Sequence, residues 1–210
     1  MSHPMNPAPI LDALDTLYPF DGKCFLNYDT PWQLLFATIL SAQCTDDRVN
    51  MVTAELFQTY PTLESIASAD MPALEEVIRS TGFFRAKARH LNISARRLLD
   101  KHRGQVPSDM ESLTALSGVG RKTANVVRGH IFGLPSITVD THVKRVSKRL
   151  GLTHNTDPVK IEYDLMKILP EEHWIRYNQQ IITHGRAVCQ SRKPKCSGCG
   201  LSGLCPEGKC

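Results

Sequence analysis

The sequence lacks any long hydrophobic run. Its longest apolar stretch, residues 34–40, includes a threonine and is far shorter than the roughly 20 residues that cross a bilayer. The first residues also lack the basic and apolar segments of an export signal. These absences exclude a membrane-spanning protein and predict a chain that stays in a reducing compartment, which in a bacterium is the cytoplasm.

Aromatic residues are few, and the cysteine count is odd. Phe, Trp and Tyr make up 7% of the 210 residues, and there are seven cysteines. An odd cysteine number without an export signal favours metal binding or free thiols over disulfides. The hydrophobic fraction of 41% is ordinary for globular proteins, and the length suffices for one large domain or two small ones.

The charge is unevenly distributed along the chain. Lys and Arg number 25 against 21 Asp and Glu. Residues 121–149 hold seven basic residues and one acid, and residues 186–210 hold five and one, which gives net +10 here and net −6 elsewhere. Such a basic field favours a phosphate backbone as partner, because binding releases counterions. Solvated basic helix faces are an equally good explanation of the charge alone.

Helical signals follow one another along the chain. Thr30 and Pro31 are typical of a helix start, and Ser108 and Glu111 have the spacing of a capping box. The only strand-like stretch, residues 137–139, is too short to found a sheet, so we predict an all-α fold. We expect helices over 32–41, 46–60, 71–82, 85–102, 109–116, 121–133, from 158 onward and over 171–188.

A glycine pair joins two of these predicted helices. Residues 116–123 read LSGVGRKT, in which Gly118 and Gly120 permit a tight turn and leave bare N–H groups at the next helix N-terminus. Such an end can bind an anion, for example a DNA phosphate, although a plain helix connector has the same pattern. In the following helix we expect Ala124, Val127 and Ile131 on the buried side and Arg121, Asn125 and Arg128 on the outer side.

Four cysteines gather within 17 residues near the end of the sequence, and they predict a metal centre. They are Cys189, Cys196, Cys199 and Cys205, spaced C-x6-C-x2-C-x5-C. Four thiolates can enclose a tetrahedral zinc ion or an iron–sulfur cluster, and the spacing does not choose between them. We expect the three remaining cysteines not to be ligands: Cys24, Cys44 and Cys210.

These motifs together resemble the helix-hairpin-helix DNA glycosylase superfamily, in particular its endonuclease III branch. The resemblance rests on TPW at 30–32, LSAQ at 40–43, the glycine turn, VDTHV at 139–143 and the cysteines. It implies a base excision repair enzyme, a bifunctional DNA glycosylase and abasic-site lyase that removes oxidised pyrimidines. The implied partner is double-stranded DNA with a damaged base or an abasic site, and the implied state is a monomer, associated with the nucleoid in a bacterium.

The resemblance also implies roles for single residues. Lys122 matches the nucleophile and lies beside Arg121 at a helix N-terminus, where the positive dipole and the like charge favour a neutral amine. Asp140 matches the carboxylate that stabilises positive charge on the sugar. Gln43 matches the glutamine that fills the gap left by a flipped base, and Phe83 stands where many relatives have a wedging leucine. Residues placed for phosphate contact are Gly118, Val119, Gly120, Arg121, Arg192, Lys193 and Lys195.

The metal centre and the architecture follow the same resemblance. It implies a [4Fe-4S] cluster on the four clustered cysteines and two helical domains with a DNA-binding cleft between them. Residues 24–134 would form the six-helix bundle with the hairpin. Residues 1–23 and 135–210 would form the iron–sulfur domain.

Several alternatives stand beside this interpretation. Within the superfamily, a monofunctional enzyme of the adenine-mismatch type would use water and no lysine, and outside it a noncatalytic iron–sulfur DNA-binding protein would need neither Lys122 nor Asp140. Asp140 would then only cap a helix, Phe83 would belong to the core and Gln43 would cap a helix. Ser117 stands where relatives usually have proline, and we expect this difference to loosen the turn without abolishing binding.

Overall fold

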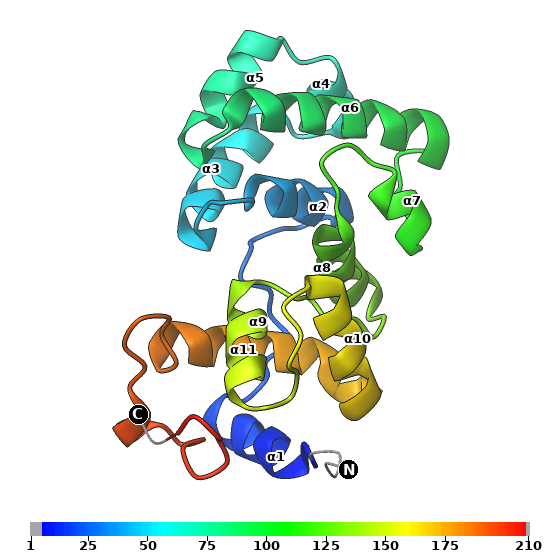
Figure 1. Cartoon of the computed structure of the whole chain (residues 1–210). Helices are drawn as coiled ribbons and strands as arrows, with labels where there is room; N and C mark the ends of the chain where they lie inside the picture. Colours follow the sequence, from blue (N-terminus) through cyan, green and yellow to red (C-terminus); the bar gives the residue numbers. More distant parts are fainter. Residues whose placement is uncertain (1–5, 209–210) are drawn as a thin grey trace. The chain divides into compact units, whose positions relative to one another are not determined.

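A computed structural model describes residues 6–208, and these residues contain helices and no strand, so the prediction of an all-α fold is confirmed. They divide into two compact units, one formed by Cys24–Gly133 and the other by the residues up to Lys23 together with those from Leu134 onward (Figure 1). The α-helices are α1 Ala8–Leu17, α2 Pro31–Leu40, α3 Asp46–Thr59, α4 Leu63–Ala67, α5 Met71–Val77, α6 Phe84–His102, α7 Met110–Thr114, α8 Arg121–Phe132, α9 Thr141–Arg149, α10 Pro158–Ile168 and α11 Trp174–Ala187. The short 3₁₀ helices are η1 Arg79–Thr81, η2 Glu171–His173 and η3 Cys196–Gly198.

The unit of residues 24–133 is built around α2. Every residue of α2 from Gln33 to Leu40 is buried, and the helix starts as predicted at Thr30, whose N–H donates to the Gln33 side-chain oxygen at 2.9 Å. The long helix α6 contacts α2, α4 and α5 (Figure 1), and Leu91, Ala95 and Leu98 are among its buried residues. Its apolar stripe is therefore the one expected from helical periodicity.

Two predicted helix boundaries in this unit were wrong. The helix expected to run to Gly82 ends at Val77 and is followed by the η1 turn, while Gly82 itself has φ +72°. The helix expected to start at a Ser108–Glu111 capping box is capped instead by Asp109, whose Oδ1 accepts the Ser112 N–H at 2.7 Å, and it ends at Thr114. A carboxylate is the better cap because it also interacts favourably with the helix dipole.

The outer face predicted for α8 also needs a correction. Ala124 and Val127 are fully buried as expected, but Asn125 is only 3% exposed and so belongs to the interior. The sequence predicts a polar side chain at that position to be on the surface. In the folded chain Asn125 is buried and has an interaction partner, as buried polar groups usually do.

The other unit has its own hydrophobic core, to which α1, α9, α10 and α11 contribute. The first of these helices, α1, carries no strong sequence signal and was not expected. It packs on α11, where the Gln180 amide donates to Asp15 Oδ1 at 2.7 Å. Tyr177 is fully buried, and its hydroxyl lies 2.7 Å from the Ser147 hydroxyl, so desolvation holds its pKa above the ordinary value. Among the described residues, no helix is long and apolar enough to cross a membrane.

Candidate functional site

The loop between α7 and α8 is a tight hairpin. Gly118 has φ +77°, and a Cβ placed on it would come within 2.8 Å of the His90 ring, so both its conformation and its space require glycine. The Val119 N–H donates to the Leu116 carbonyl at 3.2 Å, and Val119 itself is buried. Gly120 is extended and directly precedes α8, whose N-terminus has no side-chain cap. This is the turn expected from the glycine spacing.

Side chains of α6 hold the hairpin in place. The Ser94 hydroxyl donates to the Ser117 carbonyl at 2.9 Å, and Arg97 donates to the Ala115 carbonyl at 2.7 Å. Ser117 Oγ lies 2.9 Å from His90 Nδ1. The Ser117 side chain therefore gives the turn an additional contact with α6. Whether the turn is looser than one with proline stays a prediction.

The two residues predicted to carry the chemistry occupy helix N-termini. Lys122 lies in the first turn of α8 and is exposed. Asp140 is half-buried and caps α9, with its Oδ1 accepting the N–H groups of His142 at 2.8 Å and Val143 at 2.7 Å. Its other oxygen, Oδ2, makes no hydrogen bond within residues 6–208. The carboxylate thus caps α9 through one of its two oxygens.

Gln43 and Phe83 both have left-handed backbones, with φ of +54° and +49°. Arg103 is the only other non-glycine residue with positive φ in the described part of the chain. The side chain of Gln43 is exposed and Phe83 is 67% exposed, so Phe83 is not a core residue, and the N-cap of α3 is Thr45 rather than Gln43. Strained, exposed residues of this kind cluster at functional sites.

The four clustered cysteines line one pocket in the unit that contains α9 and α11. None of the four forms a disulfide, and all are half-buried. Cys199 Sγ lies 3.7 Å from His184 Nε2, and burial is the main cause that raises the pKa of Cys205. Apolar side chains complete the wall of the pocket, including Val146, Leu150, Val188 and Leu201.

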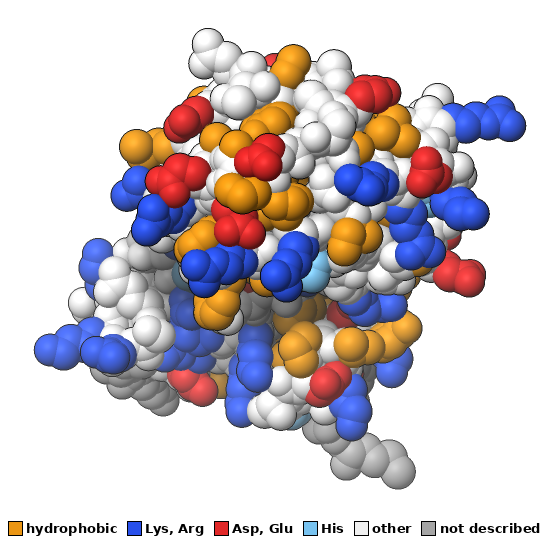
Figure 2. Space-filling view, turned by 90° about the horizontal axis from the view of Figure 1, so that it is seen from above, with side chains coloured by type: hydrophobic (Ala, Val, Ile, Leu, Met, Phe, Trp, Pro, Cys, Tyr) orange, Lys and Arg blue, Asp and Glu red, His pale blue; other side chains and the backbone are white. Residues whose placement is uncertain are grey.

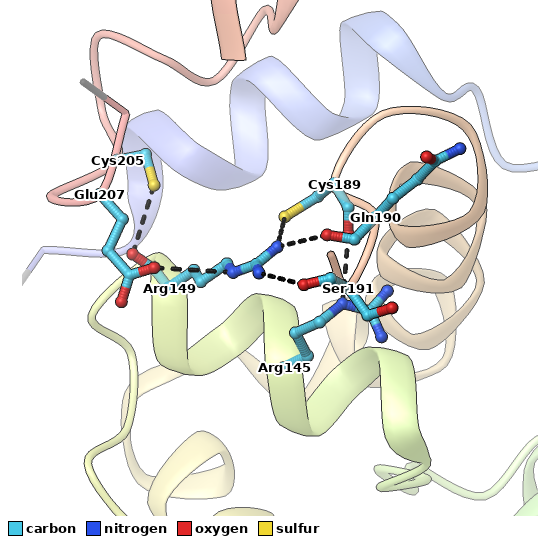
Figure 3. A network of polar contacts seen from close by, with 7 residues as sticks. All are labelled: Arg145, Arg149, Cys189, Gln190, Ser191, Cys205 and Glu207. Carbon is cyan, nitrogen blue, oxygen red and sulfur yellow. Dashed lines mark hydrogen bonds and ion pairs between the residues drawn. The ribbon is translucent and has the colours of Figure 1, made fainter. Parts of the chain in front are cut away.

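Arg149 joins α9 to this pocket (Figure 3). Its guanidinium donates to Cys189 Sγ at 3.3 Å and to the carbonyls of Gln190 and Ser191 at 2.7 and 3.0 Å, and its Nε lies 3.5 Å from Glu207. Its own carbonyl accepts from the Cys205 thiol at 3.2 Å. The last turn of α9 is therefore bonded to both ends of the cysteine segment.

Arg145 makes similar internal contacts one turn earlier. It donates to the carbonyls of Cys189 at 3.2 Å and Gly185 at 3.0 Å, and it lies 3.0 Å from His142 Nδ1. Two of the seven basic residues counted over 121–149 are thus engaged within the protein. The net +10 of the sequence overstates the charge that is available to a partner.

The loop between Cys189 and Cys196 carries the remaining predicted phosphate contacts. Arg192 and Lys193 are exposed, and Lys195 donates its ammonium to the Ala187 carbonyl at 3.1 Å. On the face of the molecule shown in Figure 2, Lys and Arg side chains lie among acidic and hydrophobic ones. Arg192 and Lys193 are accordingly the better candidates for an external anion.

Comparison with known proteins identifies the family. A family model described as HhH-GPD superfamily base excision DNA repair protein matches residues 36–171. Endonuclease III of Synechocystis sp. is 55% identical over 201 residues, or 95% of this chain and 91% of that protein, and endonuclease III of Bacillus subtilis is 42% identical over 200 residues with the same coverage. The chain belongs to the HhH-GPD superfamily of base excision DNA repair proteins.

A solved structure supports the same assignment. The structure of a trapped covalent intermediate between endonuclease III and DNA, an estranged-adenine complex, matches this HhH-GPD chain with a TM-score of 0.93 and 44% identity. The match covers 100% of this chain and 98% of that one. The resemblance inferred from the motifs is thereby confirmed.

Sequence reasoning missed several residues that shape this HhH-GPD site. The structural roles of His90 and Arg149 depend on contacts across 27 and 40 residues, for which the sequence gives no signal. Lys87 did leave a signal, because it lies four residues before Leu91 and so continues the apolar stripe of α6. A lysine on a buried stripe deserves a structural explanation, and it is only 4% exposed.

Proposed function

We propose that this HhH-GPD protein excises oxidised pyrimidines from duplex DNA and then cleaves the strand at the resulting abasic site. A DNA glycosylase and abasic-site lyase is what its endonuclease III relatives indicate. The observation that best supports the bifunctional activity is the exposed amine of Lys122, which lies in the first turn of α8 directly after the hairpin. The closely similar endonuclease III structure is a covalent DNA intermediate, as a lysine nucleophile requires.

The chemistry assigns Lys122 the covalent step. Its neutral Nζ attacks C1′ of the damaged nucleotide, and the bond from C1′ to the base breaks with the electron pair leaving on the base. Opening of the sugar and loss of the amine protons give a Schiff base between Nζ and C1′. Removal of a 2′ proton then expels the 3′ phosphate, and water hydrolyses the Schiff base to release the amine.

Asp140 supplies the negative charge that this step needs. Departure of the base leaves positive charge on the sugar, which an ionised carboxylate stabilises in the transition state. The two α9 amides hold Oδ1 in a fixed position, and Oδ2, which makes no hydrogen bond within residues 6–208, is the oxygen that can accept a proton in this proposal.

Gln43 and Phe83 take the place of the extruded nucleotide. A base inside a duplex is unreachable, so it must be turned out and the gap must be filled. Both side chains are exposed on left-handed turns of the same unit as Lys122. In this proposal Gln43 occupies the gap and Phe83 stacks against the opposite strand.

Cys189, Cys196, Cys199 and Cys205 would hold a [4Fe-4S] cluster. Their sulfurs line one largely apolar pocket, and the Arg149 N–H at Cys189 Sγ is a hydrogen bond of the kind that tunes a ligating sulfur. Within residues 6–208 no three His, Cys, Asp or Glu side chains are close enough to share a single ion, and a cubane needs no such group because each thiolate binds its own iron. The bound cluster would hold residues 190–195 rigid for phosphate contact.

Borohydride trapping tests the proposed nucleophile. The parent protein, incubated with a duplex that contains one oxidised pyrimidine, should form a covalent adduct when borohydride reduces the Schiff base. Lys122→Ala should form none, whereas Lys101→Ala, a change at another exposed lysine, should trap like the parent. An adduct that persists in Lys122→Ala would refute the assignment, and excision without any adduct in the parent would favour the monofunctional alternative.

A further inference from the structure

We propose that Lys87 is a positioning residue that holds the two DNA-inserting turns, at Gln43 and Phe83, in one arrangement. The inference rests on the proposed function of these turns and adds a residue that touches no DNA. Lys87 lies in the first turn of α6, within the same compact unit as both turns.

Lys87 bonds directly to the backbone in front of each turn. Its ammonium donates to the Leu40 carbonyl at 2.8 Å and to the Thr81 carbonyl at 2.7 Å. Leu40 precedes Gln43 by three residues, and Thr81 precedes Phe83 by two. The Lys87 N–H also donates to the Phe83 carbonyl at 3.0 Å. Lys87 therefore connects the end of α2 with the residues just before α6, and its contact with Leu40 spans 47 positions of the sequence.

The ammonium is buried without a counter-charge. Lys87 is 4% exposed, and among the described residues no carboxylate lies within ion-pair distance of it. Burial lowers its pKa, and the nearby Cys44 acts weakly in the opposite direction. An apolar side chain at this position of the stripe would avoid the desolvation penalty. The feature that an apolar residue cannot supply is the pair of short bonds to two carbonyls.

These bonds fix turns that the backbone alone would not favour. A non-glycine residue with positive φ is uncommon and persists where its surroundings impose it. Gln43 and Phe83 are two of only three such residues in the described part of the chain, and both follow a carbonyl that Lys87 holds. By fixing both carbonyls with one group, Lys87 also sets the distance between the turns, which must match the spacing of the two DNA strands.

A double-mutant cycle tests this role. Single-turnover excision from a paired duplex is measured for the parent, for Lys87→Met, for Gln43→Ala/Phe83→Ala and for the triple variant. Lys87→Met should lower the parent rate by about tenfold or more, but the rate of the Gln43→Ala/Phe83→Ala protein by less than about twofold, because residues that act as a unit are non-additive. Lys101→Met, at the exposed end of α6, is the matched control and should change neither rate.

Each outcome decides between the two proposals. An equal loss in both backgrounds would mean that Lys87 serves only stability, and it would overturn the positioning role while leaving the proposed function intact. If Gln43→Ala/Phe83→Ala excises like the parent, the proposed role of the two turns fails and the role of Lys87 fails with it. If Lys87→Met does not fold, the same double-mutant cycle is measured with Lys87→Gln, whose shorter side chain keeps a hydrogen-bond donor.

Discussion

At the scale of single residues, the proposed function gives Asp140 two tasks in one carboxylate. Oδ1 accepts two backbone amides of α9, whereas Oδ2 makes no hydrogen bond among the described residues. Because the helix cap uses only Oδ1, a substitution that keeps one acceptor oxygen can separate the effect on stability from the proposed effect on catalysis. The same separation explains why the helix-cap interpretation and the catalytic interpretation of Asp140 are compatible.

We expect Asp140→Asn to keep the cap and lose the chemistry. Asparagine caps helices about as well as aspartate, so the free energy of unfolding should change by less than about 0.5 kcal/mol. Excision should fall on the order of 100-fold, because the stabilising charge is gone. Asp140→Ala should lose the activity and, in addition, about 1 kcal/mol of stability in urea unfolding. Full excision by Asp140→Asn would contradict the catalytic role.

Gly118 and Gly120 provide a second test at this scale. Gly118→Ala brings a Cβ to 2.8 Å from the His90 ring at φ +77°, so we expect a loss of roughly 1–3 kcal/mol in urea unfolding. Gly120→Ala is the matched control, since its backbone is extended and a Cβ there meets nothing within 4 Å. Equal stability of the two variants would argue against the strained turn.

At the scale of elements, α6 is the common support of one unit. Its first turn holds the Gln43 and Phe83 turns through Lys87, and its middle holds the hairpin through Ser94 and His90. The helix itself was predictable from Leu91, Ala95 and Leu98, because apolar periodicity reflects burial. The polar contacts of α6 could not be predicted, since hydrogen bonds between distant segments leave no periodic pattern in the sequence.

The helix caps show the same limit on a smaller scale. Asp157 begins a helix and Gly133 ends one as expected, because the first offers the backbone a side-chain acceptor and the second a left-handed conformation. Thr30 also begins a helix as expected, but there the Gln33 side chain accepts the Thr30 N–H. Asp109 was missed in favour of Ser108, since both residues are good caps and only the folded chain selects one. The candidate site residues could be named only from the resemblance to a known family, because the residue types alone did not identify them. Nothing in the sequence indicated that Arg145 and Arg149 bond to groups within the protein, since a charge count does not show where a side chain points.

A prediction for α8 concerns pH. Burial lowers the pKa of His130 in the last turns of this helix. The unfolded chain then binds a proton at a higher pH than the folded one, so stability is complete above about pH 6.5 and declines as the pH falls below it. His130→Gln should make the urea unfolding free energy less dependent on pH between 7.5 and 5. An unchanged pH dependence in this variant would exclude His130 as a contributor.

At the scale of the whole molecule, binding to DNA should depend strongly on salt although the net charge is only +4. Arg192→Ala and Lys193→Ala should each reduce the slope of log K against log salt by about 1, because each removes one phosphate contact. Lys101→Ala, outside both basic stretches, should leave the slope as it is. Fluorescence anisotropy on one duplex between 50 and 200 mM salt measures these slopes. Identical slopes for all three variants would place the phosphate contacts elsewhere.

The discontinuous unit has a consequence for the order in which the protein folds on the ribosome. Residues 24–133 are contiguous, so this unit is complete once residue 133 has been synthesised. Helix α1 is made before its partner α11, which follows about 160 residues later, a delay of roughly 8–30 s at about 5–20 residues per second. During that interval Ile10, Leu11 and Leu14 have no core to enter. The nascent chain therefore carries an exposed apolar helix ahead of a folded bundle, and a chaperone that binds short apolar segments would find its target at the N-terminal end.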